Sequence, residues 1–277
     1  MILQSEGKLS EAEHLQRLSL SLFQEMSDRS NAARVAGDLS STLVLEGQLA
    51  EARKLLPAAI AEARENQVES YLPFILIYAG DLSAVEDSAS DARRNYAESL
   101  AIQEKNGESG ASVSRMSLAQ LSLDSGDAES ALNAARAVKA DTAEAQVSVS
   151  AIIAQALMVQ RKIREAAQEI EAVQELASTS QNRISAGKFI RAQSRVIAAD
   201  GHYEDALKLL KTNLLESQRM GCVLCQFETR FAIAELELNV GRTAAARTHA
   251  TALQGEARQK GFLAIAKRCS GLLSSSG

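Results

Sequence analysis

The chain has 277 residues, of which 46% are hydrophobic and only 4% aromatic, and 30 basic and 35 acidic side chains give a net charge of −5. This composition supplies a continuous core but lacks the basic excess of a nucleic-acid-binding protein, so we expect no nucleic-acid partner. The sequence begins without a signal-peptide pattern, and no apolar stretch reaches the roughly 18 residues of a membrane-spanning helix. The three cysteines do not form the even, closely spaced set of a disulfide scaffold. We therefore predict a cytoplasmic protein with no membrane partner.

Seven short runs along the chain share one pattern, in which Ala follows a turn residue by five positions. The turn residues are Gly7, Gly47, Asp87, Gly126, Arg161, Gly201 and Gly241, at spacings of 40, 40, 39, 35, 40 and 40. The alanines are Ala12, Ala52, Ala92, Ala131, Ala166, Ala206 and Ala246. Seven positions before each turn from the second onward stand the small residues Ser40, Gly80, Ala119, Ala154, Ser194 and Ala234. Small side chains at paired positions let two antiparallel helices approach closely, so each run predicts a helical hairpin.

The segments on both sides of each turn have apolar residues at helical spacing. Before the turns, residues 115–126 align with residues 230–241 without a gap, and residues 150–161 fit the same frame. After the turns, the ends of the second helices are predicted from basic residues and a Gly or Asn, which are typical of helix C-termini. These ends lie near Ser27–Ser30, Glu65–Gln67, Lys105–Gly107, Arg219–Gly221 and Gln259–Gly261.

With its small residue, turn Gly and turn-plus-five Ala in the same order, the chain resembles the tetratricopeptide repeat superfamily. The period is mostly 40 residues, against the usual 34, and most of the family's aromatic residues are missing apart from Tyr96 and Tyr203. Longer repeats of this kind look like those of large bacterial signalling proteins, such as multidomain kinases and transcriptional activators. The resemblance implies an all-α, right-handed superhelix of about seven antiparallel helical hairpins, forming one repeat domain over residues 1–277.

The two ends of the chain depart from the repeat. Too few residues precede Gly7 to make a complete first helix, so the first hairpin is predicted to be truncated. Residues 261–273 are predicted to form one further first helix that caps the C-terminus of the array. We hypothesise that the chain is the C-terminal part of a longer polypeptide.

In tetratricopeptide arrays the first helices line a concave groove, and the resemblance places the inward positions 13, 10, 6, 3 and 2 residues before each turn. The candidate groove residues are Phe74, Ile77, Met116, Gln120, Gln155, Met158, Lys188, Arg191, Arg195 and Phe231. The basic row from Lys188 to Arg195 could hold a carboxylate through charge-assisted hydrogen bonds. Alternatively, that row is a solvated face balanced by Glu228 and Glu235, and the apolar middle of the groove is ordinary packing between helices.

Residue patterns that carry catalysis are largely missing. Cys222 and Cys225 form a C-x-x-C pair, but no second pair exists and the three histidines are scattered, so we predict no metal site. We expect both thiols to be structural and buried, and leave open a reactive thiol at Cys222. No Gly-rich phosphate loop occurs, no His stands near a suitable nucleophile, and no cofactor is expected.

Three functions remain, none of them catalytic. The first is a module that binds a protein or peptide in the concave groove, where the basic row favours a partner with acidic groups. The second is a regulatory or sensor region of a larger bacterial kinase or transcriptional regulator that binds a small effector or peptide. The third is a homo-oligomerisation scaffold that uses the exposed half-hairpin.

Overall fold

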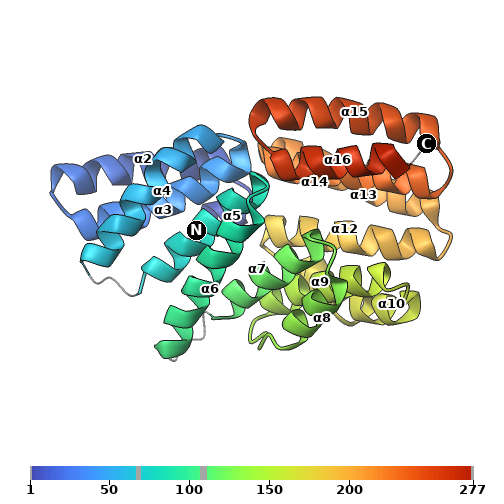
Figure 1. The fold of residues 1–277 in the computed structure, drawn as a ribbon, viewed down its shortest axis with the longest axis horizontal. Helices are drawn as coiled ribbons and strands as arrows, with labels where there is room; N and C mark the ends of the chain where they lie inside the picture. The colour runs from blue at the N-terminus through green and yellow to red at the C-terminus, as the bar shows by residue number, and fades with distance from the viewer. Residues whose placement is uncertain (1, 67–69, 107–110, 276–277) are drawn as a thin grey trace.

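The computed structural model describes residues 2–66, 70–106 and 111–275, and these residues form sixteen helices (Figure 1). The first helices of the hairpins are α1 Ile2–Ser5, α3 Arg29–Glu46, α5 Leu72–Val85, α7 Ala111–Asp124, α9 Ala143–Val159, α12 Arg183–Ala199 and α14 Val223–Asn239. Their second helices are α2 Leu9–Glu25, α4 Leu49–Glu65, α6 Ala89–Lys105, α8 Ala128–Arg136, α10 Ile163–Ala172, α13 Tyr203–Arg219 and α15 Thr243–Lys260. A short α11 (Gln174–Thr179) follows α10, and α16 (Leu263–Ser275) ends the array. Seven consecutive hairpins and an unpaired last helix agree with the prediction.

The turn inside each hairpin has the same backbone conformation. All seven predicted turn residues have a positive φ, from 61° at Arg161 to 91° at Gly201. Glycine adopts this left-handed region without steric cost, whereas Asp87 and Arg161 must tolerate it with a Cβ atom. The turn positions read from the sequence are therefore confirmed, including the two that lack Gly.

The paired small residues lie in the interior, as close packing between helices requires. The alanines five positions past each turn are at most 4% exposed, and the described small residues of the first helices are buried as well. At Gly80 an added Cβ would lie 2.3 Å from the ring of Tyr96, which occupies the space against α5. The buried hydroxyl of Ser40 donates to the carbonyl of Ala36 at 2.7 Å, which satisfies it within its own helix.

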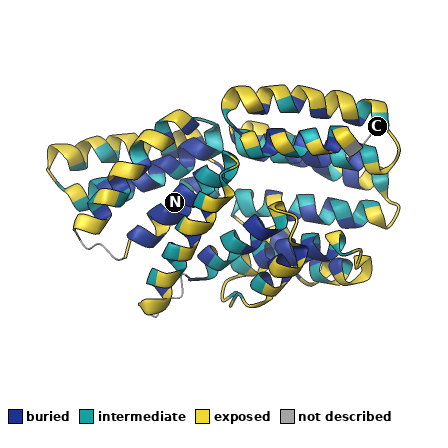
Figure 2. Ribbon diagram, in the orientation of Figure 1, coloured by how far each residue is buried: buried dark blue, intermediate teal, exposed yellow. Residues whose placement is uncertain are grey.

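The first helices are enclosed by the second helices. Figure 2 shows the middle parts of α5 and α9 as mostly buried, whereas α13 and α15 bury one stripe and expose the rest. Every first helix from α3 to α14 has a second helix behind it and another first helix beside it, so the inner faces of these helices line the interior of the superhelix.

The two ends of the array are in contact, which the repeat pattern does not predict. An open solenoid places each repeat against its neighbours only, but here α3 packs against α14, α5 against α16 and α1 against α12. An added Cβ at Gly47 would lie 3.2 Å from Val223 and 3.4 Å from the ring of Phe262. We call the contact of α3 and α5 with α14 and α16 the junction. The curvature of the seven hairpins thus brings the two ends of the superhelix into contact.

Candidate functional site

The first helices surround a central cavity of about 650 Å³. Its walls come from α3, α5, α7, α9, α12 and α14, with Arg268 of α16 at one side. This volume suits a small molecule or a few residues of a peptide, and not a folded domain. Because α3 and α14 meet at the junction, the two ends of the array contribute to the same cavity.

Two arginines in the cavity wall are held by ladders of contacts between equivalent positions of successive repeats. Arg195 donates to Gln155 Oε1 and to Glu235 Oε2, both at 2.5 Å, and each partner lies 40 residues away in sequence. Arg268 donates from Nη1 to the two carboxylate oxygens of Glu228 at 2.9 and 3.1 Å, again across 40 residues. These charges therefore link helix to helix along the inner face, at intervals of one repeat.

The mutual pairing of these charges sets their pKa values. Desolvation favours neutral Glu228, but the Arg268 and Arg191 guanidinium groups outweigh this effect and hold the pKa of Glu228 below its usual value. Desolvation also acts on Arg268, yet the Glu228, Asp124 and Glu235 carboxylates raise its pKa. Glu228 and Arg268 thus stay ionised together across the physiological range.

Lys188 and Arg191 differ from these two arginines. Both line the cavity, and neither makes a hydrogen bond or ion pair with any residue that the structure describes. Burial lowers the pKa of Arg191 to about 10, and the charges of Arg195 and Arg268 add to this effect against the opposing Glu228. The cavity wall therefore has two cationic groups whose donors are not taken up by described side chains.

Acidic groups lie opposite this basic row. Asp81 accepts a hydrogen bond of 2.7 Å from the hydroxyl of Tyr96, and desolvation raises its pKa although this bond and Lys188 act against the shift. Asp124 accepts a hydrogen bond of 2.9 Å from Gln120, and enclosure by protein likewise raises its pKa. A ligand in the cavity would meet cations on α12 and carboxyl groups on α5 and α7.

The structure brings together most of the predicted groove residues. The cavity is lined by Met116, Gln120, Gln155, Lys188, Arg191 and Arg195. Phe74, Ile77 and Met158 do not line it: Ile77 is 4% exposed in the core, Met158 packs against a core cluster, and Phe74 lies outside the cavity. The alternative of ordinary packing therefore describes Ile77 and Met158, since their faces are turned into contacts between helices.

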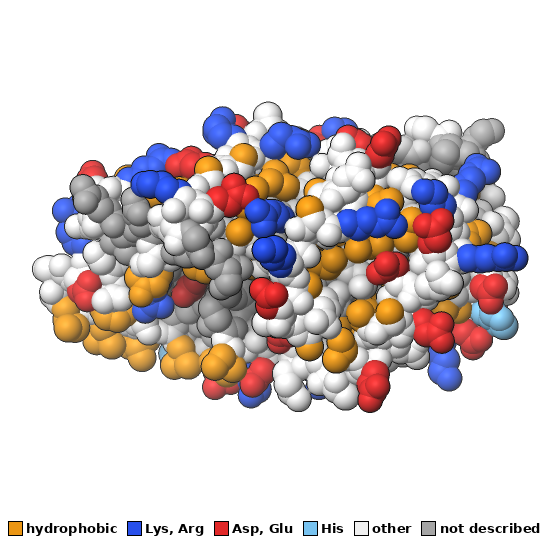
Figure 3. Space-filling model, turned by 90° about the horizontal axis from the view of Figure 1, so that it is seen from below, with side chains coloured by type: hydrophobic (Ala, Val, Ile, Leu, Met, Phe, Trp, Pro, Cys, Tyr) orange, Lys and Arg blue, Asp and Glu red, His pale blue; other side chains and the backbone are white. Residues whose placement is uncertain are grey.

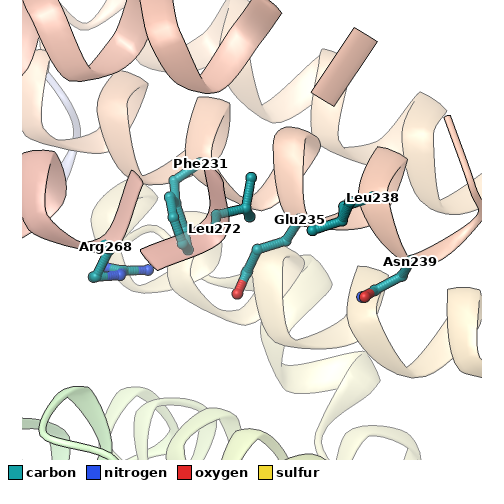
Figure 4. A pocket seen from close by; sticks show the side chains of 6 residues that line it. All are labelled: Phe231, Glu235, Leu238, Asn239, Arg268 and Leu272. Atoms are coloured by element: carbon teal, nitrogen blue, oxygen red, sulfur yellow. The ribbon is translucent and has the colours of Figure 1, made fainter. Parts of the chain in front are cut away.

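Phe231 lies in a smaller pocket beside the main cavity. This pocket of about 370 Å³ is formed by α14 and α16 and is lined by Phe231, Glu235, Leu238, Asn239, Arg268 and Leu272 (Figure 4). The Arg268 guanidinium lies 4.1 Å from the centroid of the Phe231 ring, a cation–π contact. Arg268 lines both pockets.

Arg268 lines the cavity, but the seven turns read from the sequence do not predict this. The last of these turns is Gly241, and Arg268 lies beyond it. It lies 40 residues after Glu228 and 80 after Lys188, so one more step of the period would have placed it at the inward position 13 residues before a turn. Asp81 and Asp124 also occupy inward positions, yet no feature of the sequence marks them as different from the many exposed carboxylates.

The C-x-x-C pair requires a correction. Cys222 and Cys225 are joined by a disulfide, so Cys222 is not a free reactive thiol. Both are buried, as predicted, and pack with Leu9 of α2 next to the cavity. Cys269 is the free cysteine, and burial raises the pKa of its thiol to about 11, which disfavours the reactive thiolate.

The described part of the chain contains neither a metal-binding cluster nor a membrane-spanning helix. Within the described residues, no group of three or more His, Cys, Asp or Glu side chains is placed to hold a metal ion. None of the helices in the same part of the chain combines the length and the apolar character that crossing a bilayer needs.

Comparisons with known proteins give similarity of structure but not of sequence. No family model matches, and a search of curated proteins finds no significant match. A chain of the APC/C hetero-tetramer Cut9–Hcn1 has a TM-score of 0.65 at 14% identity, over 99% of this chain and 47% of that one. Rap protein complexed with Competence and Sporulation Factor has a TM-score of 0.63 at 13% identity, over 97% and 86% of the two chains. NprR in complex with its cognate peptide NprX has a TM-score of 0.60 at 15% identity, over 96% and 82%.

The chain has a tetratricopeptide-like superhelical fold. At these identities the likeness concerns the fold alone. The chain spans less than half of the matched Cut9–Hcn1 chain and more than four fifths of Rap and NprR.

Proposed function

We propose that the chain is a non-catalytic module that binds a short peptide segment, with a carboxylate of the peptide held by Lys188 and Arg191 in the central cavity. The observation that carries this proposal is the contrast between two kinds of cation in one wall. Arg195 and Arg268 are engaged by Glu235 and Glu228, whereas the donors of Lys188 and Arg191 have no partner among the described residues. A carboxylate placed between them would supply the missing acceptor and offset the desolvation of Arg191.

The size and the lining of the cavity support a peptide. About 650 Å³ accommodates only a few side chains, and the wall combines apolar groups such as Met116 and Ile152 with amides such as Gln120. Two proteins of similar structure, Rap and NprR, were crystallised with a competence and sporulation factor and with a cognate peptide, respectively.

The proposal is tested with the double variant Lys188→Gln/Arg191→Gln. Short acidic peptides selected from a random peptide library by the wild-type chain should bind the variant roughly 10- to 100-fold more weakly, because one or two charge-assisted hydrogen bonds are lost. Isothermal titration calorimetry measures the difference. The matched control is Lys208→Gln/Lys211→Gln, which removes two exposed charges from the outer helix α13. The proposal fails if the selected peptides are not acidic, or if both double variants bind them equally.

A second candidate function is a sensor region of a larger protein. The junction favours it, because α3 and α14 line the cavity and also contact each other, so a ligand in the cavity can shift the contact between the ends of the array. If this is correct, a saturating peptide should change the distance between labels on α4 and α15, measured by fluorescence energy transfer. If the distance between the labels stays constant at saturation, the sensor function is wrong and the chain is a binding module only.

A further inference from the structure

The outer surface and the interior of the molecule differ in the chemistry that they offer. On the face that Figure 3 draws, basic and acidic side chains are interspersed, so the described charges there give no patch of a single sign. In the interior, Cys222 and Cys225 form a disulfide beside the central cavity. A disulfide is a reactive group, because thiols can open it and oxidants can restore it.

This disulfide lies where the junction meets the cavity. The side chains packed around it come from four helices: Leu9 of α2, Leu45 of α3, Ile184 of α12 and Leu224 of α14. Cys222 is fully buried, whereas Cys225 is 8% exposed and lines the cavity. A small molecule in the cavity therefore meets Cys225 and not Cys222.

The position of the bond shows that it is not a cross-link between elements. The two cysteines are three residues apart, and both belong to the start of α14, where Cys222 is the N-cap. A disulfide stabilises a fold mainly by restricting the unfolded chain, and this effect is smallest when the closed loop is short. Since both ends of the bond lie in one helix, it ties no helix to another and contributes little to the stability of the array.

The start of α14 favours the release of Cys222 during thiol–disulfide exchange. The backbone N–H of Cys225 donates to Cys222 Sγ at 3.2 Å, and the first turn of a helix carries positive partial charge. Both interactions stabilise a thiolate at Cys222, and a well-stabilised thiolate is the better leaving group. Once protonated, the two thiols fit their apolar surroundings, because a neutral Cys behaves as a small hydrophobic residue.

We propose that Cys222 and Cys225 are a redox site, whose disulfide is opened by a small thiol that enters the cavity. The thiolate of the small molecule attacks Sγ of Cys225, forms a mixed disulfide and releases Cys222 as a thiolate, which takes up a proton. A second small thiolate attacks the sulfur of the first, so Cys225 leaves as a thiolate and is protonated in turn. The two small molecules end as their own disulfide, and two electrons have passed to the cysteine pair. The reverse steps restore the bond.

Opening the bond changes the packing at the junction. Two unbonded sulfur atoms need more separation than a bonded pair, and the interior around them is closely packed. Residues next to the pair touch the first two hairpin turns: an added Cβ would lie 2.5 Å from Met220 Sδ at Gly7 and 3.2 Å from Val223 at Gly47. Reduction should therefore loosen the contact of α14 with α3. This inference does not depend on which ligand the cavity binds.

The first experiment counts thiols in the full chain after equilibration with reduced and oxidised glutathione at a series of ratios. Alkylation in denaturant after an acid quench, read by mass spectrometry, should give one thiol at the oxidising end and three at the reducing end. The constant thiol is Cys269, which is free and buried. A pair that stays oxidised at every ratio overturns the proposal, and so does a pair that never forms the bond.

The second experiment tests access through the cavity. A cavity of about 650 Å³ is too small for a folded protein. Dithiothreitol should therefore open the native disulfide faster than an equal concentration of a protein dithiol of the thioredoxin class. If the protein dithiol is the faster reductant, the small-thiol route is wrong.

The third experiment measures the effect on the junction by native-state hydrogen exchange. Reduction of the wild type should raise exchange in α3 roughly tenfold and leave α8, in the middle of the array, unchanged. The variant Cys222→Ser/Cys225→Ser should exchange alike in oxidising and reducing buffer, whereas the matched control Cys269→Ser should respond as the wild type does. Equal exchange of α3 in the oxidised and reduced wild type would overturn the link between the disulfide and the junction.

Discussion

The junction and the middle of the array are built in different ways. In the middle, one core cluster contains buried residues of α7 to α12 only, so every contact joins neighbouring elements. At the junction, a single cluster combines buried residues of α3 to α6, and Leu121 of α7, with those of α14 to α16. Local stacking is thus enough to form each hairpin, but closure of the superhelix depends on side chains that are far apart in sequence.

Some parts of the cavity wall depend on the junction and others do not. The ladders through Arg195 and Arg268 run along the inner face at intervals of one repeat and would exist in an open array. The wall contributed by Ser41 and Val44 of α3, in contrast, is brought to face the other helices by the junction. Opening the junction should therefore weaken the enclosure of a ligand and leave the basic row intact.

The largest effect is expected for Phe262→Ala. Phe262 is fully buried, lies edge to face with Phe227 at 5.3 Å, and reaches the turn at Gly47. Losing the ring should reduce the free energy of unfolding by about 3–5 kcal/mol. It should also raise native-state hydrogen exchange in α3, about 220 residues away in sequence, because α3 packs against the C-terminal helices.

Leu157→Ala is the matched control in the middle of the array. Leu157 is 1% exposed within the α7–α12 core, and its loss should cost about 2–5 kcal/mol. Native-state exchange in α3 should remain as in the wild type, since no residue of that core lies on α3. Equal exchange of α3 in the two variants would contradict the role given to the junction.

Much of the fold follows from the sequence because each hairpin is a local structure. The spacing of turn and Ala places all seven turns, and the left-handed φ of Asp87 and Arg161 appears even where Gly is missing. The contact between the two ends of the superhelix cannot be predicted from the sequence in this way. Val223 and Phe262 look like ordinary core residues of their own hairpins, and nothing in the repeat period shows that they also contact Gly47.

The residues of the candidate site also fall into two groups, those that the sequence predicts correctly and those that it does not. The basic row on α12 is visible as spacings of three and four on one helix face, and the structure places all three of its residues in the cavity wall. Ile77 occupies an equally regular position but is buried, because α5 packs against α3, α4, α6 and α7 and also against α16 of the junction. A position in the repeat predicts the direction of a side chain only where the surrounding layer is the same in every repeat.

A smaller effect is expected for Glu46→Gln, next to the junction turn. Burial, then the neighbouring Glu13 carboxylate, raises the pKa of Glu46 from its usual 4.5 to about 7. Because the folded pKa lies above the unfolded one, the folded state disfavours the charged form, and stability is lost as the pH rises from 4.5 through 7. The variant should be more stable than the wild type by on the order of 1 kcal/mol at alkaline pH, and equal to it near pH 4.5. Urea unfolding at both pH values measures this, and a constant difference between the two proteins would contradict the assignment.

The smallest effect is expected for the ion pair that spans the junction at its surface. Lys267 Nζ lies 3.0 Å from both carboxylate oxygens of Asp87, across 180 residues of sequence, but the two side chains are 71% and 37% exposed. Exposed pairs contribute little, so a double-mutant cycle with Lys267→Met and Asp87→Asn should give a coupling of about 0.2–1 kcal/mol that falls with added salt. Asn is chosen because it tolerates the φ of 62° at position 87. A coupling as large as the loss in Phe262→Ala would mean that charge, and not apolar burial, holds the two ends of the array together.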